Sequence, residues 1–196
     1  MTFLAQKQRK NISVVLLHHP MTNREGAVVT TAVTNIDLHD ISRTCRTYGI
    51  RHFFVVTPTD EQHHILGRIL GYWNVGTTLK WHPDRADALS LIQLKHNFAE
   101  VREFLIGTYG PNLEVVMPDA RPIANQVGYS QLREKWASQD DSNHAVIVLG
   151  TGWGVAPEFY SEVTTFLAPI LGLDGYNHLS VRAAAAIILD RLLSGR

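Results

Sequence analysis

The sequence predicts an α/β protein in which a parallel sheet is flanked by helices. Four short runs are rich in β-branched residues and apolar on both faces, as buried parallel strands are. They span residues 12–17, 52–57, 113–117 and 145–149. The segments between them have helical periodicity, and strands that alternate with helices form parallel sheets covered on both sides.

The helices are predicted from the spacing of apolar residues and from end signals. A stripe at helical spacing that stops at Gly49 contains Leu38, Ile41, Cys45 and Tyr48. Thr59 and Gln62 form a capping-box pattern that begins a helix running towards Trp73. Further helices are expected over residues 84–105, 130–136, 157–167 and 180–193.

Composition predicts a single domain over residues 1–196. With 196 residues, 45% of them hydrophobic and 18% charged, the chain has enough apolar material for a sizeable core. The single cysteine, Cys45, lies on an apolar stripe and excludes an internal disulfide framework and a cysteine-based zinc site. No run reaches the ~18 apolar residues that span a bilayer. These features favour a cytoplasmic protein.

The balance of charge is even overall but uneven along the chain. Lys+Arg and Asp+Glu both total 18, yet residues 1–56 hold seven basic and three acidic residues. Lys7, Arg9 and Lys10 belong to this basic excess. A basic face could guide a polyanion, although an excess of this size also arises by chance.

In parallel sheets ligands bind at the carboxyl ends of the strands, and a glycine-rich loop follows the last predicted strand. Three glycines in five positions, residues 150–154, let the backbone approach a ligand. Such a loop also fits a nicotinamide-dependent oxidoreductase or a plain tight turn. Only 42 residues follow Gly154, however, whereas a dinucleotide-binding domain begins with its glycine loop.

Two other segments carry candidate functional residues. Residues 169–180 form a long loop with Pro, Gly, Tyr and Asn, and Ser180 is placed to cap the alanine-rich helix that follows. In residues 34–50, His39, Arg43 and Arg46 share one helical face, which suits phosphate or carboxylate binding. A solvated charged face is the alternative.

Together these segments resemble the SPOUT class of S-adenosylmethionine-dependent RNA methyltransferases. Arg43, followed by a helix that ends in Tyr48-Gly49-Ile50, resembles the first motif of its SpoU branch, and residues 149–152 and 169–181 resemble the second and third. The likeness to a bacterial subgroup runs almost end to end. It rests on the strings His-His-Pro-Met (18–21), Thr-Ala-Val-Thr-Asn (31–35), Leu-Gly-Thr-Gly-Trp-Gly (149–154) and Tyr-Asn-His-Leu-Ser-Val-Arg (176–182).

The resemblance implies a SPOUT-like fold with a C-terminal trefoil knot, a homodimer, and tRNA or rRNA as substrate. It implies that S-adenosyl-L-methionine is held by Met117, Pro118, Asp119, Ala120, Leu149, Gly150, Thr151, Gly152, Trp153, Gly154, Ile170, Gly172, Tyr176, Leu179 and Ser180. The catalytic hypothesis is that Arg43 contacts the target phosphate or hydroxyl while Asn177 and Ser180 fix the reacting group. RNA contacts are assigned to Asn35, His39, Arg43 and Arg46.

Departures from the SpoU pattern leave the reaction open. Asp37 stands where Asn is usual, His39 where Gly is usual, and Gly152 where Glu is usual, while Asn177 is shifted by one position. Ribose 2′-O methylation and methylation of a base nitrogen are both retained, as is an inactive RNA-binding protein with this fold. No metal is expected, because neighbouring histidines such as His18-His19 and His63-His64 point in different directions.

Overall fold

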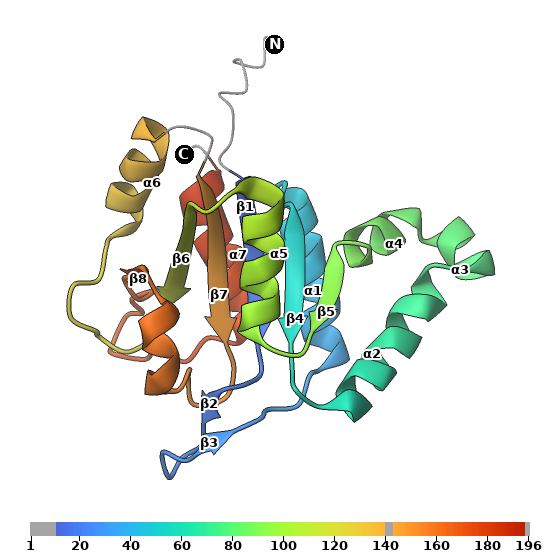
Figure 1. Cartoon of the computed structure of the whole chain (residues 1–196), viewed down its shortest axis with the longest axis horizontal. Coiled ribbons are helices and arrows are strands. Elements are labelled where there is room, and N and C mark those ends of the chain that lie inside the picture. The colour runs from blue at the N-terminus through green and yellow to red at the C-terminus, as the bar shows by residue number, and fades with distance from the viewer. Residues whose placement is uncertain (1–10, 140–142, 195–196) are drawn as a thin grey trace.

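The computed structural model describes residues 11–139 and 143–194, and their centre is a six-stranded sheet (Figure 1). The strand order is β5-β4-β1-β7-β6-β8, and every neighbouring pair is parallel. The strands are β1 (Asn11–Leu17), β4 (His52–Val56), β5 (Ile92–Lys95), β6 (Leu113–Pro118), β7 (His144–Gly150) and β8 (Thr165–Leu167). The four predicted strands and the parallel α/β class are therefore confirmed.

Helices cover both faces of this sheet. The α-helices of the described residues are α1 (Asn35–Thr47), α2 (Asp60–Trp73), α3 (Gly76–Trp81), α4 (Pro83–Leu89), α5 (Phe98–Tyr109), α6 (Tyr129–Ser138) and α7 (Val181–Leu193). One core cluster joins the sheet to α1, α4, α6 and α7, and a second joins the opposite face to α5 and the 3-10 helix Pro157–Glu162. A two-stranded hairpin, β2 (Met21–Thr22) and β3 (Val28–Val29), lies beyond the carboxyl ends of β1 and β7 (Figure 1).

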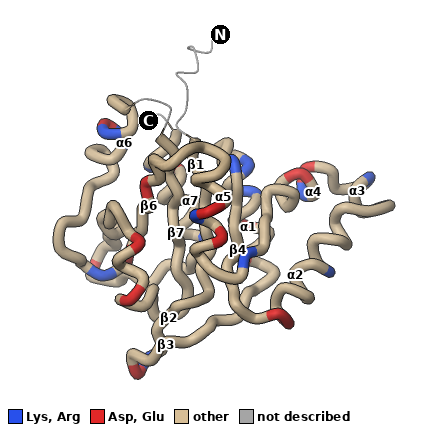
Figure 2. The backbone as a smooth tube through the Cα atoms, in the orientation of Figure 1, with Lys and Arg blue, Asp and Glu red and all other residues tan. Residues whose placement is uncertain are grey.

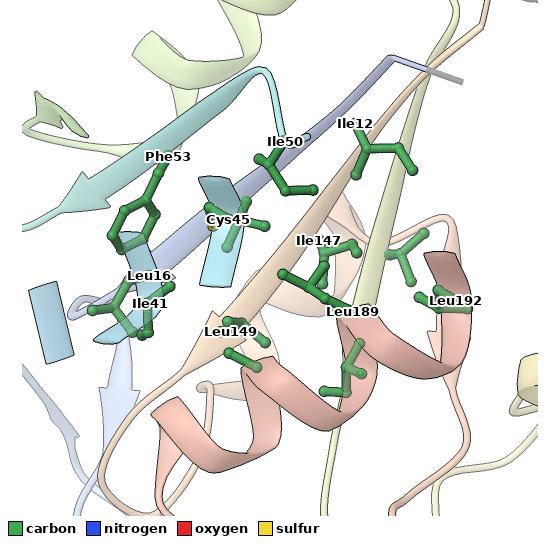
Figure 3. Close-up of a cluster of buried hydrophobic side chains, with 14 of the residues drawn as sticks. Ile12, Leu16, Ile41, Cys45, Ile50, Phe53, Ile147, Leu149, Leu189 and Leu192 are labelled. Carbon is green, nitrogen blue, oxygen red and sulfur yellow. The ribbon is translucent and has the colours of Figure 1, made fainter. Parts of the chain in front are cut away.

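Strand β1 shows why these residues make a central strand. Its residues Val14, Val15, Leu16 and Leu17 are all fully buried, because successive side chains enter the two opposite cores. On the α1/α7 side they meet Cys45 and the leucines of α7 (Figure 3). Burial raises the pKa of the Cys45 thiol far above its usual value, so Cys45 is a core residue, as predicted.

The prediction of one long helix over residues 84–105 is wrong. The segment divides into α4, β5 and α5, because Ile92–Lys95 adds to the sheet edge beside β4. The next helix then begins afresh at Asn97, whose side chain accepts a hydrogen bond from the Glu100 amide at 3.0 Å. The helix expected over 157–167 is likewise a short 3-10 helix followed by β8, which pairs with β6.

The prediction of a capping box at Thr59 is also wrong, although α2 itself is present as predicted. Thr59 is the N-cap residue but its side chain makes no capping hydrogen bond. Gln62 turns away from it: its Oε1 accepts from the Val33 amide at 2.8 Å, and its Nε2 donates to the Thr31 carbonyl at 3.4 Å. Gln62 therefore holds the chain just before α1.

Charged residues of both signs are interspersed over the described part of the fold (Figure 2). Lys7, Arg9 and Lys10 of the basic N-terminal excess lie outside the described residues. Among residues 11–139 and 143–194, no helix is both long and apolar enough to cross a membrane.

Candidate functional site

The three loops predicted to form the site meet at the carboxyl edge of the sheet. They are residues 117–120 (the β6 loop), residues 150–154 (the glycine loop) and residues 170–180 (the C-terminal loop). The side-chain amide of Asn177 donates through Nδ2 to the Ala120 carbonyl at 2.7 Å, which joins the C-terminal loop to the β6 loop. Gly154 packs against Arg121, the residue after Ala120, so the glycine loop reaches the same place.

The glycine loop is held in a tight turn against the β2–β3 hairpin. The Gly154 amide donates to the Thr151 carbonyl at 3.1 Å, and the Thr22 amide donates to the Gly154 carbonyl at 2.9 Å. Gly154 has a φ of 105°, and a Cβ there would lie 2.9 Å from a guanidinium nitrogen of Arg121. The turn leaves Trp153 at its tip, 63% exposed.

The β6 loop is built around a buried carboxylate. Asp119, whose side chain is 7% exposed, receives two hydrogen bonds from the Arg121 guanidinium, at 2.9 and 2.8 Å. These bonds raise the pKa of Arg121, which also donates to the Tyr160 hydroxyl at 3.1 Å. The loop therefore has a fixed shape, and the guanidinium of Arg121, which follows it, packs against Gly154.

The C-terminal loop exposes apolar side chains and ends in a helix cap. A Cβ on Gly172 would collide with the Tyr176 carbonyl oxygen, so the turn requires glycine at this position. Ser180 caps α7 as predicted, its Oγ accepting from the Ala183 amide at 3.3 Å. Leu171, Leu173, Tyr176 and Leu179 are all exposed.

A groove between α1 and the start of α7 brings two of the predicted catalytic residues together. Its volume is about 590 Å³, and its lining includes Arg43, Ser180, Asp40, Tyr48 and Arg182. Arg43 is exposed on α1, whereas Ser180 comes from the C-terminal loop. Asn177 instead joins two loops, as described above.

The residues predicted to contact RNA all lie on α1 but have different neighbours. Arg46 pairs with Asp87 of α4, and the His39 ring lies 5.2 Å from that of Trp73 in an edge-on arrangement. Burial, with a contribution from Arg85, lowers the pKa of His39. Asn35 is exposed at the first turn of α1. Arg43 therefore faces the groove, while His39 and Arg46 face α2 and α4.

An ion pair that the sequence did not predict joins α1 to α7. The Arg182 guanidinium lies 3.1 Å from Asp37 and 3.6 Å from Asp40. The Thr34 hydroxyl also donates to Asp37, at 2.6 Å. Asp37, one of the departures from the SpoU pattern, thus serves as an anchor for Arg182, which stands at the end of the Tyr-Asn-His-Leu-Ser-Val-Arg string.

Comparison with known families decides the class of this protein. A model described as SAM-dependent RNA methyltransferase matches residues 11–194. The chain belongs to this family. The predicted methyl donor and RNA methyltransferase class are thereby confirmed, and the nicotinamide alternative is set aside.

Relatives and solved structures agree with this family. An uncharacterized protein of Aquifex aeolicus is 38% identical over 185 residues, covering 94% of this chain and 89% of that protein. A protein of Nitratidesulfovibrio vulgaris named tRNA (guanine-N(1)-)-methyltransferase is 37% identical over 184 residues, covering 94% of this chain but 42% of that protein. The crystal structure of the A. aeolicus TrmH/SpoU tRNA modifying enzyme superposes with a TM-score of 0.57 at 16% identity, covering 97% and 77% of the two chains. The family model thus confirms the resemblance to S-adenosylmethionine-dependent RNA methyltransferases, and the A. aeolicus structure shows a shared fold.

The loops of this methyltransferase fit its donor in chemistry. S-adenosylmethionine presents an adenine ring, ribose hydroxyls and a charged amino-acid end. The C-terminal loop offers exposed apolar side chains, and the glycine loop offers the exposed Trp153 ring at its tip. No group of three or more His, Cys, Asp or Glu side chains placed to hold a metal ion occurs among the described residues.

Proposed function

We propose that this methyltransferase transfers the methyl group of S-adenosylmethionine to tRNA or rRNA, at a base nitrogen or a ribose 2′-hydroxyl. The observation that carries the proposal is the meeting of three separate loops around residues 119–121, next to the groove that Arg43 and Ser180 share. The name of the N. vulgaris relative supports tRNA, although this chain spans less than half of that protein.

We assign the donor site to the three loops. The β6 loop, the glycine loop and the C-terminal loop would hold the adenosine and ribose. The residues assigned to this site are Met117, Pro118, Asp119, Ala120, Leu149, Gly150, Thr151, Gly152, Trp153, Gly154, Ile170, Gly172, Tyr176, Leu179 and Ser180. When bound, the donor supplies a sulfonium methyl group for an in-line displacement. The protein's own task is then to bind, orient and align the acceptor.

We assign the acceptor side to the α1/α7 groove. Arg43 is exposed there and carries a planar cation suited to a phosphate or to a ribose hydroxyl. Asn177 and Ser180 would act from the C-terminal loop. Asn177 would fix the position of this loop through its hydrogen bond to Ala120. Asn35, His39 and Arg46 would extend the RNA contact along α1.

We further propose that the chain is one knotted domain that acts in the cytoplasm as a homodimer. The path of the chain after β8 supports the knot. Ala168 is hydrogen-bonded to Val127 at the edge of the sheet, yet the helix that follows packs on α1 and α6. The chain between them must therefore cross back past the β6 loop, which Asn177 touches.

The test is transfer of a labelled methyl group from S-adenosylmethionine to RNA, followed by mass spectrometry of the nucleosides. We expect Arg43→Ala to lower the transfer rate about 100-fold, the size typical of a lost transition-state contact, with donor affinity unchanged. Arg68→Ala is the matched control and should change the rate less than threefold, because Arg68 is an exposed arginine of α2 that does not line the groove. Equal losses in both variants would contradict the role of Arg43. RNA binding without transfer by the wild-type protein would indicate the inactive alternative.

A further inference from the structure

A buried histidine, His18, lies behind the glycine loop and has no role in the function proposed above. It follows β1 directly, and its amide donates to the Val56 carbonyl at 2.9 Å. The side chain is fully buried. Its Nδ1 lies 2.9 Å from the Thr31 hydroxyl, and its Nε2 has no hydrogen-bond partner among the described residues.

Thr31 connects this histidine to the glycine loop. Its hydroxyl lies 2.6 Å from the hydroxyl of Thr151, which lies 3.2 Å from the Leu17 carbonyl. Four groups from three separate segments therefore form one chain of polar contacts behind the glycine loop, where β1 and β7 end (Figure 1).

The direction of the hydrogen bonds follows from the acceptor at the end of this chain. A carbonyl accepts, so the Thr151 hydroxyl donates to Leu17 and accepts from Thr31. The Thr31 hydroxyl has then used its hydrogen and accepts from His18, which places the ring hydrogen on Nδ1. Reversing the chain would place the ring hydrogen on Nε2, where the N–H would be buried without a partner among the described residues. A buried N–H without a partner is rarer in proteins than a buried acceptor without one.

The position of Thr31 is itself fixed by the backbone around it. Its amide donates to the His18 carbonyl at 2.9 Å, and its carbonyl accepts from Gln62 at 3.4 Å. Its methyl group would lie 3.1 Å from a Cβ on Gly152. Thr31 thus supports the glycine loop both by a hydrogen bond to Thr151 and by contact beneath Gly152.

We propose that His18 is a positioning residue of the methyl-donor site, in which its Nδ1–H, acting through the hydroxyls of Thr31 and Thr151, fixes the glycine loop against the end of β1. His18 itself does not touch the donor. The inference rests on the proposed donor site and adds to it a defined ring tautomer and a defined direction for every hydrogen bond. Burial, partly offset by the negative charge of Asp37, lowers the pKa of His18 to about 4, which keeps the ring neutral at physiological pH.

The first test is the tautomer of the wild-type ring, read from two-bond ¹H–¹⁵N spectra of ¹⁵N-labelled protein at pH 7.5. We expect the pattern of a neutral Nδ1–H ring for the resonance that disappears in His18→Asn. An Nε2–H pattern for that resonance would overturn the proposal. This measurement does not depend on donor binding, because His18→Asn serves only to assign the resonance.

The second test is donor affinity, measured by calorimetry with S-adenosylmethionine on a matched pair of variants. His18→Asn places an amide N–H where Nδ1 lies, whereas His18→Gln places its amide nearer the position of Nε2. We expect His18→Asn to bind within threefold of the wild type and His18→Gln to bind at least tenfold more weakly. Equal affinity in both variants, or the reverse order, would overturn the proposal.

Thr31 provides a second pair that keeps the test decisive if the histidine variants fail to fold. Thr31→Ser keeps the hydroxyl, and Thr31→Val removes it while keeping the shape. We expect weaker donor binding, by tenfold or more, in Thr31→Val alone. A wild-type protein that does not bind S-adenosylmethionine would refute the proposed function, whereas normal wild-type binding with unaffected Thr31→Val would refute this inference alone.

Discussion

The two ends of the central sheet each contain a histidine hydrogen-bond network, but the networks connect different kinds of structure. At the amino ends of the strands, Nε2 of His52 in β4 lies 2.8 Å from the Tyr109 hydroxyl of α5. Its Nδ1 lies 2.9 Å from the side-chain amide nitrogen of Gln93 in β5. These three residues belong to regular elements. At the carboxyl ends, His18, Thr31 and Thr151 connect three segments that lie outside helices and strands.

This difference separates stability from function. Helices and strands are held in place by the core, so a lost hydrogen bond at the amino end affects mainly the free energy of unfolding. Loops have few apolar contacts of their own, so their positions depend on single polar contacts. Changes at the carboxyl end should therefore alter ligand binding as well as stability.

The largest expected effect is the acid sensitivity that His18 confers. Its pKa is about 4 in the folded protein and 6.5 in the unfolded chain. Above pH 6.5 both states are neutral, so stability is unaffected. Between pH 6.5 and 4 the unfolded chain binds a proton that the folded protein does not. The free energy of unfolding should fall by about 3 kcal/mol across this range.

The measurement is urea denaturation at pH 7.5 and pH 4.5 for the wild type and for His18→Asn. The variant should lose less stability on acidification, and the difference between the two proteins removes the effect of other titrating groups. Identical losses in both proteins would show that the His18 ring takes up a proton in the folded state as readily as in the unfolded chain.

The next effect concerns the C-terminal loop. Gly172→Ala should weaken S-adenosylmethionine binding at least about tenfold, or about 1.4 kcal/mol, because the new methyl group would push the Tyr176 carbonyl aside. Calorimetry measures the affinity. Gly107→Ala on α5 is the control: apart from its chain neighbours and the backbone of its own helix, nothing lies within 4 Å of its Cβ position, so donor binding should be unchanged. Unaltered binding in Gly172→Ala would remove this turn from the donor site.

The same contrast explains what the sequence could predict. Strand β1 and helix α1 were predictable because each has, within its own sequence, the spacing of apolar residues that the buried cores require. The division of residues 84–105 was not, because β5 exists only by pairing with β4, far away in the sequence. At the site, the glycine loop was found from its composition. Thr31 and Arg182 were not assigned roles because their partners, Thr151 and Asp37, are 120 and 145 residues away.

The ion pair between α1 and α7 is intermediate between the two histidine networks: it joins regular helices, as the network at the amino end does, but it lies beside the groove. Asp37→Asn should lower the free energy of unfolding by about 2 kcal/mol, since the Asp37 side chain is 10% exposed and its loss leaves Arg182 poorly paired. Asp40→Asn is the control, with an expected loss below about 0.5 kcal/mol, because Asp40 is 44% exposed and 3.6 Å away. Chemical denaturation measures both, and equal losses would mean that Asp37 is no special anchor.

The smallest effect tests the amino end directly. Tyr109→Phe removes the hydroxyl that pairs with His52 but keeps the ring that stacks on His144 at 4.2 Å. The free energy of unfolding should fall by about 1 kcal/mol, the net value of one hydrogen bond. Because this network contacts only regular elements at the end of the sheet opposite the three loops, the affinity for S-adenosylmethionine should stay within twofold of the wild type. A drop in affinity as large as that of Thr31→Val would show that the two ends are coupled through the strands, and the separation of stability from function would then fail.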